Sequence, residues 1–151
     1  MSTFNLRYDL ESPTNLLGLV ADSRVTHTVT IKAAEAIAPG EPVGYNGLLA
    51  AGPTAPIKGV ARLQTSLEQT DAGLVEYAIG DAVPLVSFGP VWVRAAKAVS
   101  AGVPAYAILS GTTKGQFTDT QSGVTTTAPV GFFETATPGS ANAILFVQRG
   151  A

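Results

Sequence analysis

The chain has 151 residues, a formal net charge of −2 and no cysteine, so disulfide bonds and cysteine-ligated metal sites are both excluded. Its 9 basic and 11 acidic residues are scattered singly. This distribution offers neither the electropositive stripe that nucleic acid requires nor the basic cluster that an anionic membrane attracts. No apolar run approaches the roughly 20 residues of a membrane span, and the first residues lack a basic-then-apolar secretion signal.

Charge and hydropathy together indicate a surface that other subunits cover. Only 13% of the residues are charged, against about a quarter in an average domain, and the mean hydropathy is +0.27. Few charges keep such chains apart in water, which favours self-association or binding to a larger assembly. A monomer with a surface rich in Thr, Ser and Gly is the alternative.

Residues 1–24 differ from the rest and predict an extended N-terminal arm ahead of a single β domain at 25–151. Phe4, Leu6, Tyr8 and Leu10 alternate with polar residues, which is typical of a half-buried strand, and Pro13 ends the pattern. A strand with one apolar face is costly in water, so we expect it to dock on a partner. The predicted partner-contact residues are Phe4, Leu6, Arg7, Tyr8 and Leu10.

From Val25 onward the sequence is typical of strands. Val25, Thr26 and residues 28–31 are mostly β-branched, and turn signals recur every 8–12 residues to the end of the chain. The alanine-rich residues 33–38 are stopped by Pro39 and Gly40, and we interpret them as the continuation of a strand. The apolar run at residues 143–147 predicts a buried closing strand.

An internal repeat is the strongest signal in the sequence. Residues 29–43 align without gaps onto residues 91–105, with six of fifteen pairs identical, and a second matching element follows each copy, so that the repeats span 29–61 and 91–133. The extra length of the second copy falls in the polar residues 110–127, as expected of an inserted loop or hairpin. Two copies suit two halves that close on each other. We therefore predict an all-β fold, a jelly-roll-like sandwich or small barrel built from two related halves.

No catalytic, cofactor-binding or metal-binding residues are predicted, and we expect the chain not to be an enzyme. His27 has no second His or Cys to work with, so we interpret it as a strand residue on the solvated face or at an interface. Asp71, Glu76 and Asp81 fall near turns, where such residues bond local backbone. No nucleophile elbow, phosphate-binding loop or calcium loop is present. The aromatic residues Trp92, Phe132 and Phe133 favour core packing, or for Trp92 an interface.

The turn-and-strand pattern at residues 39–43, the segment 56–61 and their second copies resemble the cement or decoration proteins of tailed-phage heads. The resemblance covers residues 29–147; residues 1–24 have no assigned counterpart. It implies a jelly-roll or related barrel and a homodimer or homotrimer on the outer capsid surface. It also implies a partner, the major capsid protein, whose subunits the cement protein bridges, and it supplies no catalytic residues. A particle assembled in a reducing host cytoplasm and released outside suits a cysteine-free chain.

Two other functions stay open at this point. A carbohydrate- or host-binding β-sandwich module of a phage tail or fibre would need exposed aromatics along a groove, and Tyr45, Tyr77 and Tyr106 are the candidates. A small trimeric β-barrel hydrolase that processes nucleotides would need a catalytic Asp and a Ser/Gln motif, which are not evident.

Overall fold

The computed structural model describes residues 17–45, 57–64, 76–120 and 126–148. These residues contain strands and no helix, which confirms the all-β fold class. The strands are β1 (His27–Lys32), β2 (Pro42–Gly44), β3 (Ile57–Ala61), β4 (Ala82–Ala95), β5 (Pro104–Ile108), β6 (Phe117–Thr118), β7 (Thr126–Phe133) and β8 (Ala141–Val147).

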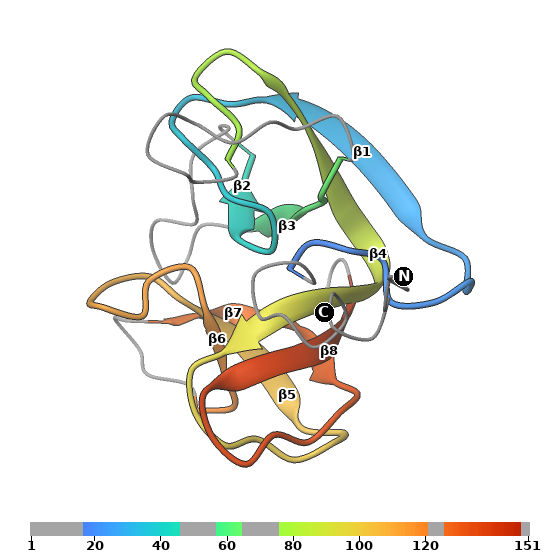
Figure 1. Ribbon diagram of the computed structural model, residues 1–151, viewed down its shortest axis with the longest axis vertical. Coiled ribbons are helices and arrows are strands. Elements are labelled where there is room, and N and C mark those ends of the chain that lie inside the picture. The colour runs from blue at the N-terminus through green and yellow to red at the C-terminus, as the bar shows by residue number, and fades with distance from the viewer. Residues whose placement is uncertain (1–16, 46–56, 65–75, 121–125, 149–151) are drawn as a thin grey trace, which may run out of the picture.

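Strand β4 is 14 residues long and belongs to two sheets (Figure 1). Its first half pairs with β1 on one side and with β3 on the other, and β3 continues to β2. Its second half pairs with β8, which is followed by β7, β5 and β6. The parallel pairing of β6 with the end of β4, Ala95 opposite Phe117, closes these five strands into a small barrel. Of the predicted alternatives, the small barrel is therefore the one adopted, and residues 143–147 form a strand as expected, within β8. The strand that closes the barrel is β6, however.

The apolar core consists of two clusters, a larger one centred on the barrel and a smaller one at the other sheet. The barrel is filled by fully buried side chains that include Val91, Val93, Phe117, Phe133 and Leu145. The sheet at the other end of β4 covers a smaller cluster, with Ile37, Val43, Ala61, Tyr77, Val83 and Leu85. Burying a side chain of this size contributes about 1.5–3 kcal/mol. The larger cluster also takes in Val60 of β3 and Val86 of β4, so it joins the first sheet to the barrel.

The two copies of the repeat have the same local structure. In the first copy β1 ends at Lys32, the chain bends at Ala34 and Glu35, and Ile37 forms a single bridge with Tyr77. In the second copy β4 ends at Ala95, the chain bends again, and Val99 forms the corresponding bridge with Thr137. The interpretation of residues 33–38 as the continuation of a strand was wrong, because the chain bends at Ala34 and Glu35 and pairs again only at Ile37.

The turn that follows each bridge needs glycine. Gly40 and Gly102 have φ angles of 88° and 85°, a region that residues with a side chain rarely adopt. Their N–H groups donate to equivalent carbonyls, Gly40 to Ala61 at 2.8 Å and Gly102 to Phe133 at 2.6 Å. These bonds join β2 to β3 in one half and β5 to β7 in the other in the same way.

The insertion in the second copy makes the two halves different. Residues 110–127 carry β6, which pairs with both β5 and the end of β4. A closed barrel therefore forms only where the longer copy supplies this additional strand. The first half keeps its sheet open at β1 and β2, with no further strand beyond either among the described residues.

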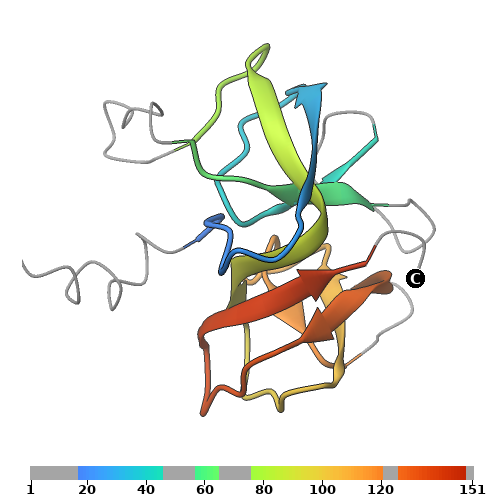
Figure 2. The ribbon, with the colours of Figure 1, turned by 90° about the vertical axis from the view of Figure 1, so that its right-hand side faces the viewer.

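The inner end of the predicted arm lies against β4. Gly18 N–H donates to Trp92 at 2.8 Å, Trp92 N–H donates to Leu19 at 2.9 Å, and Leu63 N–H donates to Gly18 at 3.0 Å. Residues 17–21 thus run beside β4 on the side that also carries β3 (Figure 2). The division of the chain at residue 24 remains a prediction.

Close packing of β7 on β8 depends on Gly131. A methyl group added there would lie 1.9 Å from the Phe146 carbonyl oxygen, and one added at the equivalent Gly59 would lie 2.7 Å from the Val86 carbonyl oxygen. We expect Gly131→Ala to lower the free energy of unfolding by about 3 kcal/mol, because overpacking against backbone forces the two strands apart. Urea denaturation measures this. Gly139→Ala is the control: nothing lies within 4 Å of the added methyl, and the change should stay within about 0.5 kcal/mol. Equal stability of the two variants would show that the packing of β7 on β8 does not require glycine at residue 131.

Candidate contact surface

Four rings from four adjacent strands form a row across the junction of the two sheets. We call His27 of β1, Phe88 of β4, Phe146 of β8 and Phe132 of β7 the aromatic row. The ring centroids of successive members are 5.7, 5.1 and 5.4 Å apart. The Phe88 and Phe146 rings meet edge to face, and the Phe146 and Phe132 rings stack, which are the arrangements that aromatic pairs prefer.

The aromatic row is open to solvent, unlike the two cores. The Phe88 side chain is 38% exposed, His27 is exposed, and Phe132 and Phe146 are half-buried. Val25, two residues before His27, is 73% exposed. Large apolar groups held rigid at a surface are the residues that most often anchor protein contacts.

Arg24 fixes one side of the aromatic row. Its guanidinium carbon lies 5.3 Å from the centre of the Phe146 ring, and Nη1 donates to Glu134 Oε2 at 2.7 Å. Nη2 donates to Asp22 Oδ2 at 2.7 Å, and these hydrogen bonds from Arg24 lower the pKa of Asp22. The pairs are exposed and add little stability. Their effect is on position, because the Arg24–Glu134 pair connects the segment that leads into β1 to the residue that follows β7.

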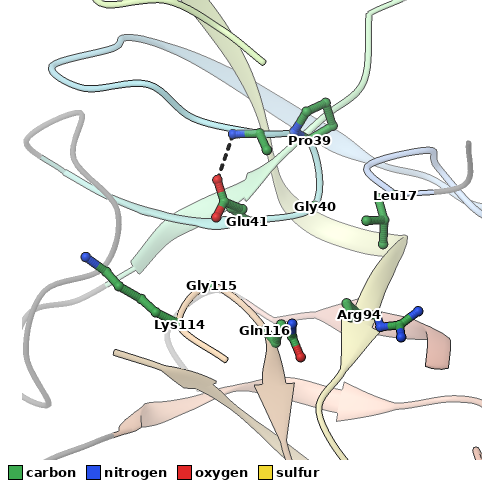
Figure 3. Close-up of a pocket in the computed structure, with 9 residues that line it drawn as sticks. Leu17, Pro39, Gly40, Glu41, Arg94, Lys114, Gly115 and Gln116 are labelled. Atoms are coloured by element: carbon green, nitrogen blue, oxygen red, sulfur yellow. Dashed lines mark hydrogen bonds between the residues drawn. The ribbon is translucent and has the colours of Figure 1, made fainter. Parts of the chain in front are cut away.

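A cavity of about 340 Å³ lies where the first half meets the inserted loop of the second (Figure 3). The turn at Gly40 and Glu41 forms one wall, and residues 114–116 form another. Glu41 Oε1 accepts the Ala38 N–H at 2.7 Å, and a side chain at Gly115 would collide with Glu41 Oε2. Burial raises the pKa of Glu41, partly offset by the Ala38 hydrogen bond and further raised by Glu35 and Glu76.

The polar groups around this cavity do not converge on a ligand position. In Figure 3 the side chains of Arg94 and Lys114 extend in opposite directions, away from Glu41. Arg94 Nη2 donates outside the cavity to the Ser140 carbonyl at 3.4 Å. We interpret the cavity as a gap in the packing between the two halves, in which Glu41 stabilises the turn at Gly40 through its hydrogen bond from Ala38.

The residues singled out in the sequence are distributed widely. The predicted contact residues Phe4, Leu6, Arg7, Tyr8 and Leu10 lie outside the described residues. Asp81 Oδ2 accepts the Ala78 N–H at 2.9 Å and so bonds local backbone as expected. His27 is an exposed strand residue, as predicted.

The aromatic predictions were right only in part. Phe133 is fully buried in the barrel core, but Phe132 is half-buried and belongs to the aromatic row. Trp92 is half-buried. The carbohydrate-binding alternative loses one of its candidates, because Tyr77 is 1% exposed and its hydroxyl donates to the Arg62 carbonyl.

In residues 17–45, 57–64, 76–120 and 126–148, no three His, Asp or Glu side chains are grouped so as to hold a metal ion. Among the same residues none forms a helix with the length and apolar character of a membrane span.

The fold of this chain also occurs in a solved phage capsid structure. A chain in the capsid of Myoviridae phage XM1 matches 99% of this chain over 100% of its own length, with 19% sequence identity and a TM-score of 0.72. The base of the head fibre gp8.5 of bacteriophage phi29 matches 82% of this chain over 94% of its own, with 13% identity and a TM-score of 0.44. No curated protein sequence matches this chain.

The strands, the closed barrel and the capsid likeness define an all-β chain whose fold also occurs in a phage head. The family model described as "Structural cement protein (E217 gp24/Pam3 gp6)" matches residues 4–149, so the chain belongs to the structural cement protein family of phages. It is a structural protein that associates with capsid proteins in the virion. The match includes residues 4–24, for which the sequence had shown no counterpart.

The cavity yields a pH-dependent prediction about stability. Because the pKa of Glu41 is raised in the folded chain above its ordinary value of 4.5, ionisation disfavours folding. The wild type therefore loses stability relative to Glu41→Gln as the pH rises from about that value through the raised one. Glutamine keeps an oxygen for the Ala38 N–H, so we expect a higher melting temperature for the variant at pH 7 and no difference at pH 3.

Thermal unfolding across this pH range measures the effect. Asp81→Asn is the matched control, since Asp81 makes the corresponding contact to the residue three before it in an exposed turn. A Glu41→Gln variant that is less stable than the wild type at pH 7 would show that the charged hydrogen bond outweighs burial.

Proposed function

We propose that this chain sits on the outer surface of the phage head and bridges neighbouring major capsid protein subunits. Family membership supplies the association with capsid proteins. The observation that carries the finer proposal is the aromatic row, which supplies a rigid, partly exposed apolar surface of the kind that a protein partner covers.

A bridging protein needs more than one contact surface. The aromatic row lies at the junction of the sheets, and the predicted arm residues Phe4, Leu6, Arg7, Tyr8 and Leu10 supply the second contact. If each surface contacts a different capsid subunit, the chain connects the two subunits. The low charge of the chain, 13% of residues, suits close packing on a lattice.

The energetics of such a cement follow from mass action. A protein that binds the assembled shell and not the free coat subunit stabilises the shell by an amount that grows with its concentration over its Kd. Many modest contacts repeated over the lattice add through multivalency. We further propose that the chain acts as a homodimer or homotrimer and joins the shell in the host cytoplasm, where the absence of cysteine makes it indifferent to the redox state.

The Phe88 side chain provides the direct test. We expect Phe88→Ser to weaken binding to purified heads that lack this protein by tenfold or more, because truncating an anchoring aromatic costs about 2 kcal/mol. Co-sedimentation measures binding, and the temperature at which heads open measures the stabilisation. Ile79→Ser is the control, because Ile79 is 73% exposed on the turn before β4 and outside the aromatic row. Wild-type binding by Phe88→Ser, or an equal loss of binding in both variants, would rule out the aromatic row as the surface that contacts the capsid.

The arm is tested by deleting residues 1–10. We expect the truncated chain to unfold at nearly the same temperature, because the described hydrogen bonds to β4 begin at Gly18. Self-association or head binding should fall, as measured by analytical ultracentrifugation and co-sedimentation. A lower melting temperature with association intact would mean that the arm only completes its own domain.

A further inference from the structure

Strand β1 is the long open edge of the described fold. The barrel strands are paired on both sides, since the ring from β4 through β8, β7, β5 and β6 returns to β4. In the other sheet β2 has three residues, whereas β1 has six, all paired to β4 on one side only. An unpaired strand edge presents a row of backbone N–H and C=O groups to any strand that can reach it.

The sequence of β1 lacks the devices that normally protect such an edge. It reads His-Thr-Val-Thr-Ile-Lys, with no proline and no charge before its last residue. The irregularity in its pairing lies at its start, between His27 and Thr28, so the stretch that follows is regular. Natural edges are blunted by inward charges, proline or bulges along their length. An edge without them is expected to be covered in the working assembly.

The two faces of β1 set the pattern of a matching strand. Val29 and Ile31 are half-buried and pack against the apolar cluster of the first half, whereas Thr28, Thr30 and Lys32 are exposed. An added strand with apolar residues at every second position would extend the Val29 and Ile31 face and cover its open side. Its polar residues would then share a face with the threonines.

One segment of this chain has that pattern and length. Phe4, Leu6, Tyr8 and Leu10 alternate with Asn5, Arg7 and Asp9 over seven residues, against six in β1. Its alternating polar residues include one positive and one negative charge, which suits the exposed face that carries Lys32. Addition of a strand to a sheet edge is a recurrent way for extended segments to bind.

We propose that residues 4–10 of a second copy of this chain add to β1 as an edge strand. This inference rests on the arm contact in the proposed function and names its acceptor. The described chain starts beside β4 on the side of β3, through the Leu63–Gly18 hydrogen bond, whereas β1 lies on the opposite side of β4. To pair with its own β1 the arm would have to cross β4, whereas the β1 of a second copy requires no such crossing. One arm and one edge per chain close into an exchanged dimer or, head to tail, into a trimer.

The absence of native cysteine makes the contact testable by disulfide trapping. Asn5→Cys, Arg7→Cys and Asp9→Cys are each mixed with an affinity-tagged Thr30→Cys chain under mild oxidation. Side chains opposite each other on paired strands are close enough for a disulfide. We expect at least one mixture to give covalent heterodimer on a non-reducing gel, several-fold above the same arm variants mixed with Thr112→Cys. Thr112 is also exposed but lies on a turn between β5 and β6.

Each other outcome overturns the inference in a distinguishable way. Heterodimer yields equal to those of the Thr112→Cys control mean that the arm does not meet β1 of a second copy. A shifted monomer band for Arg7→Cys with Thr30→Cys in one chain, without heterodimer in the mixtures, means that the arm covers its own β1. No trapping of either kind, with head binding still lost on deleting residues 1–10, means that the arm docks on the coat and leaves the proposed function standing.

Discussion

The continuity of β4 is the constraint on which the rest of the structure depends. One strand of 14 residues supplies a central strand to an open sheet at one end and to a closed barrel at the other. Its buried side chains enter both apolar cores, Val83 and Leu85 in the first and Val91 and Val93 in the second. The pairing of this one strand on both sides therefore sets the position of the two halves at the junction.

The repeat explains why such a junction exists. Both copies use a strand, a bend, a bridge and a glycine turn, and the backbone hydrogen bonds of Gly40 and Gly102 are equivalent. The second copy begins within β4, and the earlier part of β4 pairs with β1, the strand that opens the first copy. The insertion carrying β6 then closes one half only. Among the described residues, related sequences thus give one closed half and one half that is open at both β1 and β2.

The candidate surfaces follow from this asymmetry. The aromatic row crosses the junction, and its His27 end is the first residue of β1, so the row and the open edge are continuous. Arg24 links the segment before β1 to Glu134 at the end of β7, which fixes the approach of the chain to both surfaces. The open edge of β1 offers backbone pairing, which fixes the direction of a partner strand. The aromatic row beside it offers apolar side chains, which contribute binding energy.

The sequence by itself determined the all-β class, the positions of the glycine turns and the strand at residues 143–147, because turn chemistry and strand propensity are local and act within a few residues. It also carried the family, through patterns spread over the chain. Only the tertiary structure decided that residues 33–38 bend, that β6 closes a barrel, and that Phe132 faces outward while Phe133 faces in. The aromatic row could not be read from the sequence, since its members are separated by up to 119 positions, from His27 to Phe146, and meet only through the register of four strands. A one-residue slip in any of those registers would turn its ring to the other face.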